Sequence, residues 1–141
     1  MKFMLIMRTV DQAAVERMAE ADFEEMIAAM GAFNESMVNA GVLSDGAGLA
    51  DPSEGAVVDF SGTEPTSTTG AYGTLRELFN GFWIVDVATQ DEAITWAKKA
   101  PLETGSQIEV RRVNGPEDFP EDNEWVQKEQ EWIEQGRLDK G

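Results

Sequence analysis

The sequence predicts an α+β fold with four or five strands, two main helices and one sheet covered by helices. Three neighbouring segments carry this prediction. Residues 82–87 form a short run rich in aromatic and β-branched side chains, which favours a buried strand. Residues 89–101 have helical spacing, and Ile108 and Val110 alternate with charged neighbours as in a half-buried strand. Strand, helix and strand therefore follow one another directly.

The first strand is expected at residues 3–7, because this apolar run is too short for a helix and ends at a charged residue. Residues 9–20 are polar and weakly periodic, which predicts a loop that can include a helical turn. The N-terminal run is also too short for a secretory signal, and no stretch reaches the ~20 apolar residues that span a bilayer. A soluble cytoplasmic protein is therefore expected.

A long helix is expected from Asp22 onwards. Gly41 is well placed to end it in a left-handed conformation. The apolar residues that recur at the spacing of one helix face are Phe23, Met26, Ile27, Met30, Phe33, Met37 and Val38. Methionine fills irregular space readily, so this face suits either core packing or the lining of an adaptable pocket.

Shorter elements follow. Residues 56–60 and 66–69 are expected to be strands joined by a turn, and residues 74–79 a short helical turn. The second main helix starts with the pattern of a capping box. In that pattern the Thr89 hydroxyl accepts from the N–H of Glu92, and the Glu92 carboxylate accepts from the N–H of Thr89.

The last part of the chain differs in composition. After a turn-rich stretch, an acidic helix is expected from near Glu121 to Gly136, with a narrow stripe formed by Trp125, Val126, Trp132 and Ile133. Two tryptophans are costly to leave in water, so the helix is expected to dock on its own domain or on a partner subunit, with a foreign partner as the alternative. The predicted organisation is an α+β domain at 1–113 and an acidic helical extension at 114–141.

Charge and composition exclude several functions. The chain has 11 basic and 27 acidic residues, a net charge of -16, so nucleic acid and anionic membranes are not expected as main partners. The absence of cysteine and histidine excludes thiolate nucleophiles, Ser-His-Asp triads and imidazole-ligated metals. Proton transfer would fall to carboxylates, lysine or the single tyrosine, Tyr72. Only a hard cation held by oxygens remains possible, and no cofactor or metal site is predicted.

Four residues are individual candidates for a site. Asp45 lies before a glycine-rich turn, where its carboxylate could face a cleft or bond its own backbone. Tyr72 could act as a phenol or simply pack, and Arg8 could meet an anionic ligand or form an ion pair at the end of a strand. Trp83 could line a cleft or lie in the sheet. The predicted ligand-binding set is Arg8, Met30, Phe33, Met37, Asp45, Tyr72 and Trp83.

Several segments in order resemble the YCII-related family, and within it the DGPF-domain branch. They are residues 1–5, 40–43, 46–49 with Pro52-Ser53, 81–87, 91–97 and 108–113, so the resemblance covers roughly residues 1 to 113. It implies a ferredoxin-like α+β domain with an antiparallel sheet and helices on one face. It also implies that this domain pairs sheet to sheet with a twin as a dimeric α/β barrel, with a cleft beside the sheet.

The chain departs from the family at the residues that would carry chemistry. The histidine and aspartate proposed as an acid–base pair in YCII-like enzymes fall at Met30 and Asn39 here. The Asp-Gly-Pro-Phe motif falls at Thr69-Gly70-Ala71-Tyr72, which keeps the glycine and an aromatic but loses the carboxylate and the proline.

These departures favour a non-catalytic homodimeric module whose cleft binds a small, largely apolar ligand. One alternative is a cofactor-independent enzyme acting on a hydrophobic, enolisable substrate through Asp45 or Tyr72. Another follows from the resemblance, because DGPF-like proteins are associated with sigma factors: a regulatory accessory protein that binds a basic protein partner.

Overall fold

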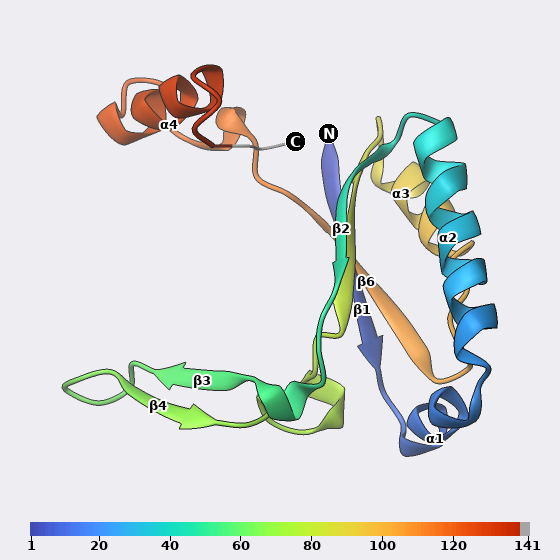
Figure 1. The fold of residues 1–141 in the computed structure, drawn as a ribbon. Coiled ribbons are helices and arrows are strands. Elements are labelled where there is room, and N and C mark those ends of the chain that lie inside the picture. The colour runs from blue at the N-terminus through green and yellow to red at the C-terminus, as the bar shows by residue number, and fades with distance from the viewer. Residues whose placement is uncertain (139–141) are drawn as a thin grey trace.

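A four-stranded antiparallel sheet forms the centre of the computed structural model, which describes residues 1–138. The strands lie in the order β2 (Leu43–Gly48), β5 (Gly81–Asp86), β1 (Lys2–Thr9) and β6 (Ser106–Arg112). Helices α2 (Phe23–Asn39) and α3 (Gln90–Ala97) cover one side of this sheet (Figure 1). The predicted α+β class and the antiparallel sheet are confirmed, and the described residues do not close into a barrel.

The remaining elements lie around this two-layer unit. Helix α1 (Gln12–Glu20) follows β1, and strands β3 (Ala56–Asp59) and β4 (Thr66–Thr69) form a separate hairpin between β2 and β5. Helix α4 (Glu124–Glu134) follows β6. Three short 3₁₀ helices are η1 (Pro52–Glu54), η2 (Leu75–Glu77) and η3 (Pro116–Asp118). The predicted C-terminal extension, 114–141, ends in residues 139–141, which lie outside the described part.

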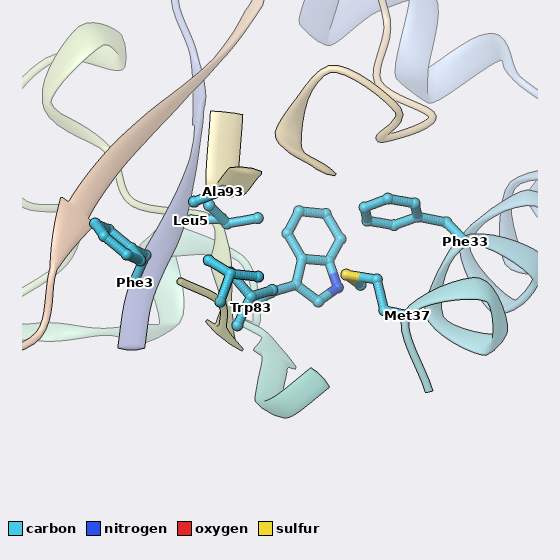
Figure 2. Close-up of a cluster of buried hydrophobic side chains, with 8 residues drawn as sticks. Phe3, Leu5, Phe33, Met37, Trp83 and Ala93 are labelled. Atoms are coloured by element: carbon cyan, nitrogen blue, oxygen red, sulfur yellow. The ribbon is translucent and has the colours of Figure 1, made fainter. Parts of the chain in front are cut away.

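The core forms where α2 and α3 meet the sheet. Its buried side chains are Phe3, Leu5, Phe33, Met37, Trp83, Val85, Val87 and Ala93. Figure 2 shows the Trp83 indole between the side chains of the sheet and those of α2. The rings of Phe33 and Trp83 meet edge to face, with centroids 5.1 Å apart and planes at 84°. Such a pair adds about 0.5–1.5 kcal/mol to the burial of its area.

The opposite side of the sheet is not covered by helices. Strand residues alternate between the two faces, so Met4, Ile6, Phe82 and Ile84 share this second side, which we call the open face. The register pairs Met4 with Ile84 and Ile6 with Phe82, so the four side chains lie together. Ile6 is buried by its neighbours, and the other three are half-buried. Within one chain, β5 is therefore covered on one side only.

The structure of residues 9–20 differs from the predicted loop. Helix α1 occupies most of it, because Asp11 caps the helix through an Oδ1 that accepts from the Ala14 N–H over 2.6 Å. Ala14 is the only buried residue of this helix, which explains the weak apolar periodicity. Strand β1 also extends beyond the predicted 3–7, since Arg8 and Thr9 pair with Gln107 and Ser106 of β6.

The ends of the two main helices follow the local sequence. Asp22 caps α2, and Gly41 after it has the expected left-handed φ of 72°. At α3 the Glu92 N–H donates to the Thr89 hydroxyl over 3.2 Å, as predicted. The Glu92 carboxylate, however, accepts from the N–H of Ala88 instead of Thr89, over 3.1 Å. Only one half of the predicted capping box is therefore formed.

The β3–β4 hairpin and α4 both extend from the sheet on the side away from α2 and α3 (Figure 1). The hairpin leaves at one end of the sheet and α4 at the other. The open face lies between these two projections. Their arrangement decides which surfaces of the molecule remain available to a ligand or a partner.

Candidate functional site

A groove lies at the base of the β3–β4 hairpin, and we call it the hairpin groove. It encloses about 370 Å³. Its lining combines the end of β2 and η1 with the segment that returns to β5: Leu49, Ala50, Asp51, Pro52, Glu54, Gly55, Ala56, Gly70, Tyr72, Glu77, Leu78 and Phe79. Loop segments from two parts of the chain thus form one concave surface beside the open face.

One wall of the groove is built around Asp51. Its Oδ1 accepts from the backbone N–H of Ser53 over 2.9 Å and from the Ser53 hydroxyl over 2.7 Å, which starts η1. These hydrogen bonds, that from the Ser53 hydroxyl first, lower the pKa of Asp51, so its carboxylate stays ionised. The Gly70 N–H donates to the Gly55 carbonyl over 2.8 Å and joins this wall to the opposite one.

The other wall is tied to the sheet. The Glu77 carboxylate accepts from the Thr74 N–H over 2.9 Å and closes η2. The Arg8 guanidinium donates to the Glu77 carbonyl over 3.4 Å, and the Asn80 N–H donates to the Met7 carbonyl over 3.0 Å. Strand β1 therefore fixes the position of Leu78 and Phe79 in the groove. The Phe79 ring also packs against Phe82 of the open face, with centroids 6.2 Å apart.

The two candidate acid–base residues are not brought together in this groove. Tyr72 lines it, with 66% of the residue exposed. Asp45 lies on β2 opposite Ile84, is exposed, and accepts from the N–H of Gly46 over 2.8 Å. Asp45 thus makes the local backbone bond that a turn aspartate makes, and it does not line the hairpin groove.

Arg8 lies at the edge of the open face. Besides its bond to Glu77, its guanidinium is 3.9 Å from the Glu109 carboxylate, and Arg111 approaches the same carboxylate at 3.8 Å. At these distances neither guanidinium hydrogen-bonds the carboxylate, and among the described residues the buried Glu109 Oε2 has no hydrogen-bond partner. The group therefore contributes little to stability. Arg8 therefore acts here as a link between β1 and the groove wall.

The remaining predicted ligand-binding residues lie on the helix-covered side of the sheet. Phe33, Met37 and Trp83 are buried in the core, and Met30 packs against it half-buried. Asn39 is exposed at the end of α2. These residues therefore lie apart from Tyr72, since none of them lines the hairpin groove.

Sequence reasoning missed the apolar residues that line the groove, above all Leu49, Leu78 and Phe79. Leu49 stands alone in a stretch rich in turn residues, whereas Leu78 and Phe79 follow Leu75 at helical spacing and were interpreted only as part of a short helical turn. An isolated large apolar residue in a loop is the signal that could have found Leu49. Their convergence depends on the Gly70–Gly55 and Asn80–Met7 hydrogen bonds, which the sequence does not reveal.

Within residues 1–138, no three acidic side chains gather closely enough to hold a metal ion. Over the same range, no helix has the length and apolar character needed to cross a membrane.

Comparison with known proteins places the chain in a family. No curated protein gives a significant match to this sequence. The family model of the YCII-related domain matches residues 1–117, which include the whole four-stranded sheet, α2, α3 and the hairpin groove. The chain therefore belongs to the YCII-related domain family.

Proposed function

We propose that this protein is a non-catalytic, cytoplasmic homodimeric module whose hairpin groove binds a small, largely apolar molecule. The observation that carries the proposal is the exposed apolar lining of the groove. Tyr72 and Phe79 are 66% and 38% exposed there, beside Leu49 and Leu78. Large apolar side chains converge in a concave site more often than on a plain surface. At about 370 Å³ the groove lies at the small end of the range for ligand pockets.

The charges around the groove favour a neutral or cationic ligand. Asp51, Glu54 and Glu77 contribute carboxylates to the lining, and no basic residue does. The lowered pKa of Asp51 keeps negative charge at this wall, which would repel an anion. The ligand should therefore be an uncharged or positively charged apolar molecule.

Binding is favoured over catalysis by the surroundings of Tyr72. Among residues 1–138, no hydrogen bond joins its hydroxyl to a carboxylate or to another base. General acid–base catalysis needs such a partner within hydrogen-bonding reach. Asp45, the other candidate, has its carboxylate engaged by Gly46. The family positions that would carry proton transfer are Met30 and Asn39, which cannot titrate.

The proposal of a homodimer rests on the open face. The strand order, with α2 and α3 as the connections, supports a ferredoxin-like domain. Such a sheet buries one side under its own helices, and the apolar group of Met4, Ile6, Phe82 and Ile84 would be buried by a twin packed sheet to sheet. The two chains would together form a dimeric α/β barrel. We also propose that the chain belongs to the DGPF branch, and two residues of its degenerate motif at 69–72, Gly70 and Tyr72, line the groove.

Ligand binding is tested with the neutral dye Nile red and a panel of neutral and cationic apolar compounds. We expect dye fluorescence to rise with wild-type protein, and Tyr72→Ala and Phe79→Ala each to weaken binding at least fivefold. Phe60→Ala is the matched control, because Phe60 is 74% exposed on the hairpin but outside the groove. Equal affinity in all four proteins, or no compound that raises the melting temperature, would refute the proposal.

The dimer is tested separately by light scattering at micromolar concentration. We expect the mass of two chains, reduced to one in Ile84→Lys, which places a charge on the open face. Ile27→Lys is the control, because Ile27 is 56% exposed on α2, away from the open face. A single-chain mass for the wild type would exclude the dimer without touching the ligand proposal.

A further inference from the structure

Helix α4 presents an apolar face that its own chain does not bury. The apolar side chains of this helix, Trp125, Val126, Trp132 and Ile133, recur at a spacing of seven and eight residues and so share one side. None of them is buried, and Trp125 and Trp132 are 65% and 36% exposed. A tryptophan face of this kind is typical of a helix that docks on another surface.

The segment that joins β6 to α4 is held in one orientation. The Arg112 guanidinium forms two hydrogen bonds to the Asp118 carboxylate, over 2.7 and 2.6 Å. Asp118 also accepts from the N–H of Gly115 over 2.7 Å. This bidentate pair holds η3 against the end of β6 and directs α4 to the side of the sheet opposite α3 (Figure 1).

A second groove, whose lining is largely apolar like the face of α4, lies between α3 and β6, and we call it the α3–β6 groove. It encloses about 380 Å³. The residues of its lining that matter here are Ile94, Ala97, Leu102, Ile108, Val110 and Lys98. Helix and edge strand thus enclose an apolar channel whose wall carries one basic and one acidic residue, Lys98 and Glu103. An apolar channel of this form can receive an amphipathic helix.

The charges of the helix and of this groove are complementary. Helix α4 carries Glu124, Glu129, Glu131 and Glu134 against the single basic residue Lys128. Lys98 and Lys99 form one of only two adjacent basic pairs in a chain of net charge -16. Two copies of so acidic a chain repel each other at long range, so contact is favoured where carboxylates meet this lysine pair.

We propose that α4 of one copy docks in the α3–β6 groove of a second copy, and that the exchange is reciprocal. The apolar face of α4 lies along the channel, and Glu131 and Glu134 face Lys98 and Lys99. The second copy is the occupant because α4 extends from its own sheet towards the side of the open face, where a twin lies, and away from its own α3 (Figure 1). The inference rests on the proposed homodimer but not on the ligand of the hairpin groove.

The chain contains no cysteine, so a thiol cross-linker reacts only at cysteines that are introduced. Glu129→Cys places a thiol between the apolar residues of α4, and Glu103→Cys places one in the lining of the α3–β6 groove, where Glu103 is exposed. Neither change removes an apolar side chain. The two variants, one carrying a mass tag, are mixed and treated with a short bismaleimide, and we expect a covalent heterodimer. Replacing Glu103→Cys by Ile27→Cys on the outer side of α2 should abolish that product.

Three results would overturn the inference. The first is the absence of a covalent heterodimer when light scattering still gives the mass of two chains. That result would contradict the docking of α4 but not the sheet-to-sheet dimer. The second is an equal product with Ile27→Cys. The third comes from the double variant Glu129→Cys/Glu103→Cys diluted in excess wild type: an internal cross-link there would mean that α4 docks on its own chain. A single-chain mass for the wild type would instead remove the proposed dimer together with this inference.

A charge-reversal pair gives an independent readout. Lys98→Glu/Lys99→Glu should weaken dimerisation at least tenfold, and adding Glu131→Lys/Glu134→Lys in the same chain should restore it, because the reversed charges meet again across the interface. Arg17→Glu/Arg76→Glu is the control, since both residues are exposed and lie outside α3 and α4. Weakening by the control alone, or no rescue, would contradict the docking.

Discussion

The indole Nε1 of Trp83 donates a hydrogen bond to Oδ1 of Asn34 over 2.8 Å. Trp83 lies on β5 and is only 4% exposed, and Asn34 lies on α2. A buried indole has one donor and needs a partner for it. This bond therefore fixes the position of the long helix over the sheet at the same place where Trp83 packs against Phe33.

Asn34→Ala should destabilise the protein by about 1–3 kcal/mol, because it leaves the buried indole N–H without an acceptor. The measurement is chemical unfolding followed by tryptophan fluorescence. Asn39→Ala is the matched control: Asn39 is exposed at the end of the same helix, and its loss should change the free energy of unfolding by less than about 0.5 kcal/mol. Equal effects of the two variants would argue against a structural role for the bond.

Met37→Ala should cost about 2–5 kcal/mol of stability, because Met37 is fully buried in the core cluster and its truncation leaves a cavity. The neighbouring Val38→Ala should cost much less, since Val38 is 60% exposed. Thermal and chemical unfolding measure both. If Met37 lined an open ligand pocket instead, its truncation would be mild and would change Nile red binding.

Gly81→Ala should destabilise the sheet by about 1–3 kcal/mol through overpacking. A Cβ at Gly81 would lie 2.7 Å from the Ala47 carbonyl oxygen and 3.1 Å from the Gly48 Cα, and backbone atoms cannot move away easily. Gly48, its partner in the register, has no atom within 4 Å of an added Cβ, so Gly48→Ala is the control. A larger effect at Gly48 in a denaturant titration would contradict this account of the close approach.

The pKa of Asp118 is lowered from its ordinary 3.8 to about 2, chiefly by the Arg112 hydrogen bonds and then by the Gly115 N–H. Because the folded pKa is the lower one, the contribution of this pair is complete well above 3.8 and is lost as the pH falls through about 2. Carboxyl-carbon NMR should give this titration directly. Arg112→Gln should move the pKa part of the way back towards 3.8, since the Gly115 bond remains.

Arg111→Gln is the control for this titration. Arg111 approaches Glu109, not Asp118, so its loss should leave the pKa of Asp118 unchanged. A similar rise in both variants would point to the general field of the basic residues and not to the bidentate pair.

The sequence by itself determined most elements of the main unit, although β2 was not predicted. The Asp22 cap, the apolar repeat and Gly41 define α2 closely, because caps and helical periodicity are local properties of the chain. Strand β5 and the β3–β4 hairpin were predicted for similar reasons. Helix α1 was not, since one buried alanine gives no readable period. The role of Trp83, left open between cleft and sheet, was decided by its partners Asn34 and Phe33.

Only the tertiary structure decided what lies together. It placed Tyr72 beside Phe79 in a groove and left Asp45 bonded to its own neighbour, although the sequence treats both as equal candidates. It also separated Met30, Phe33 and Met37 from that groove by putting them on the helix-covered side of the sheet. The physical reason is that a strand's two faces and a loop's path are set by pairing and hydrogen bonds between distant segments, which a local pattern of residues does not specify.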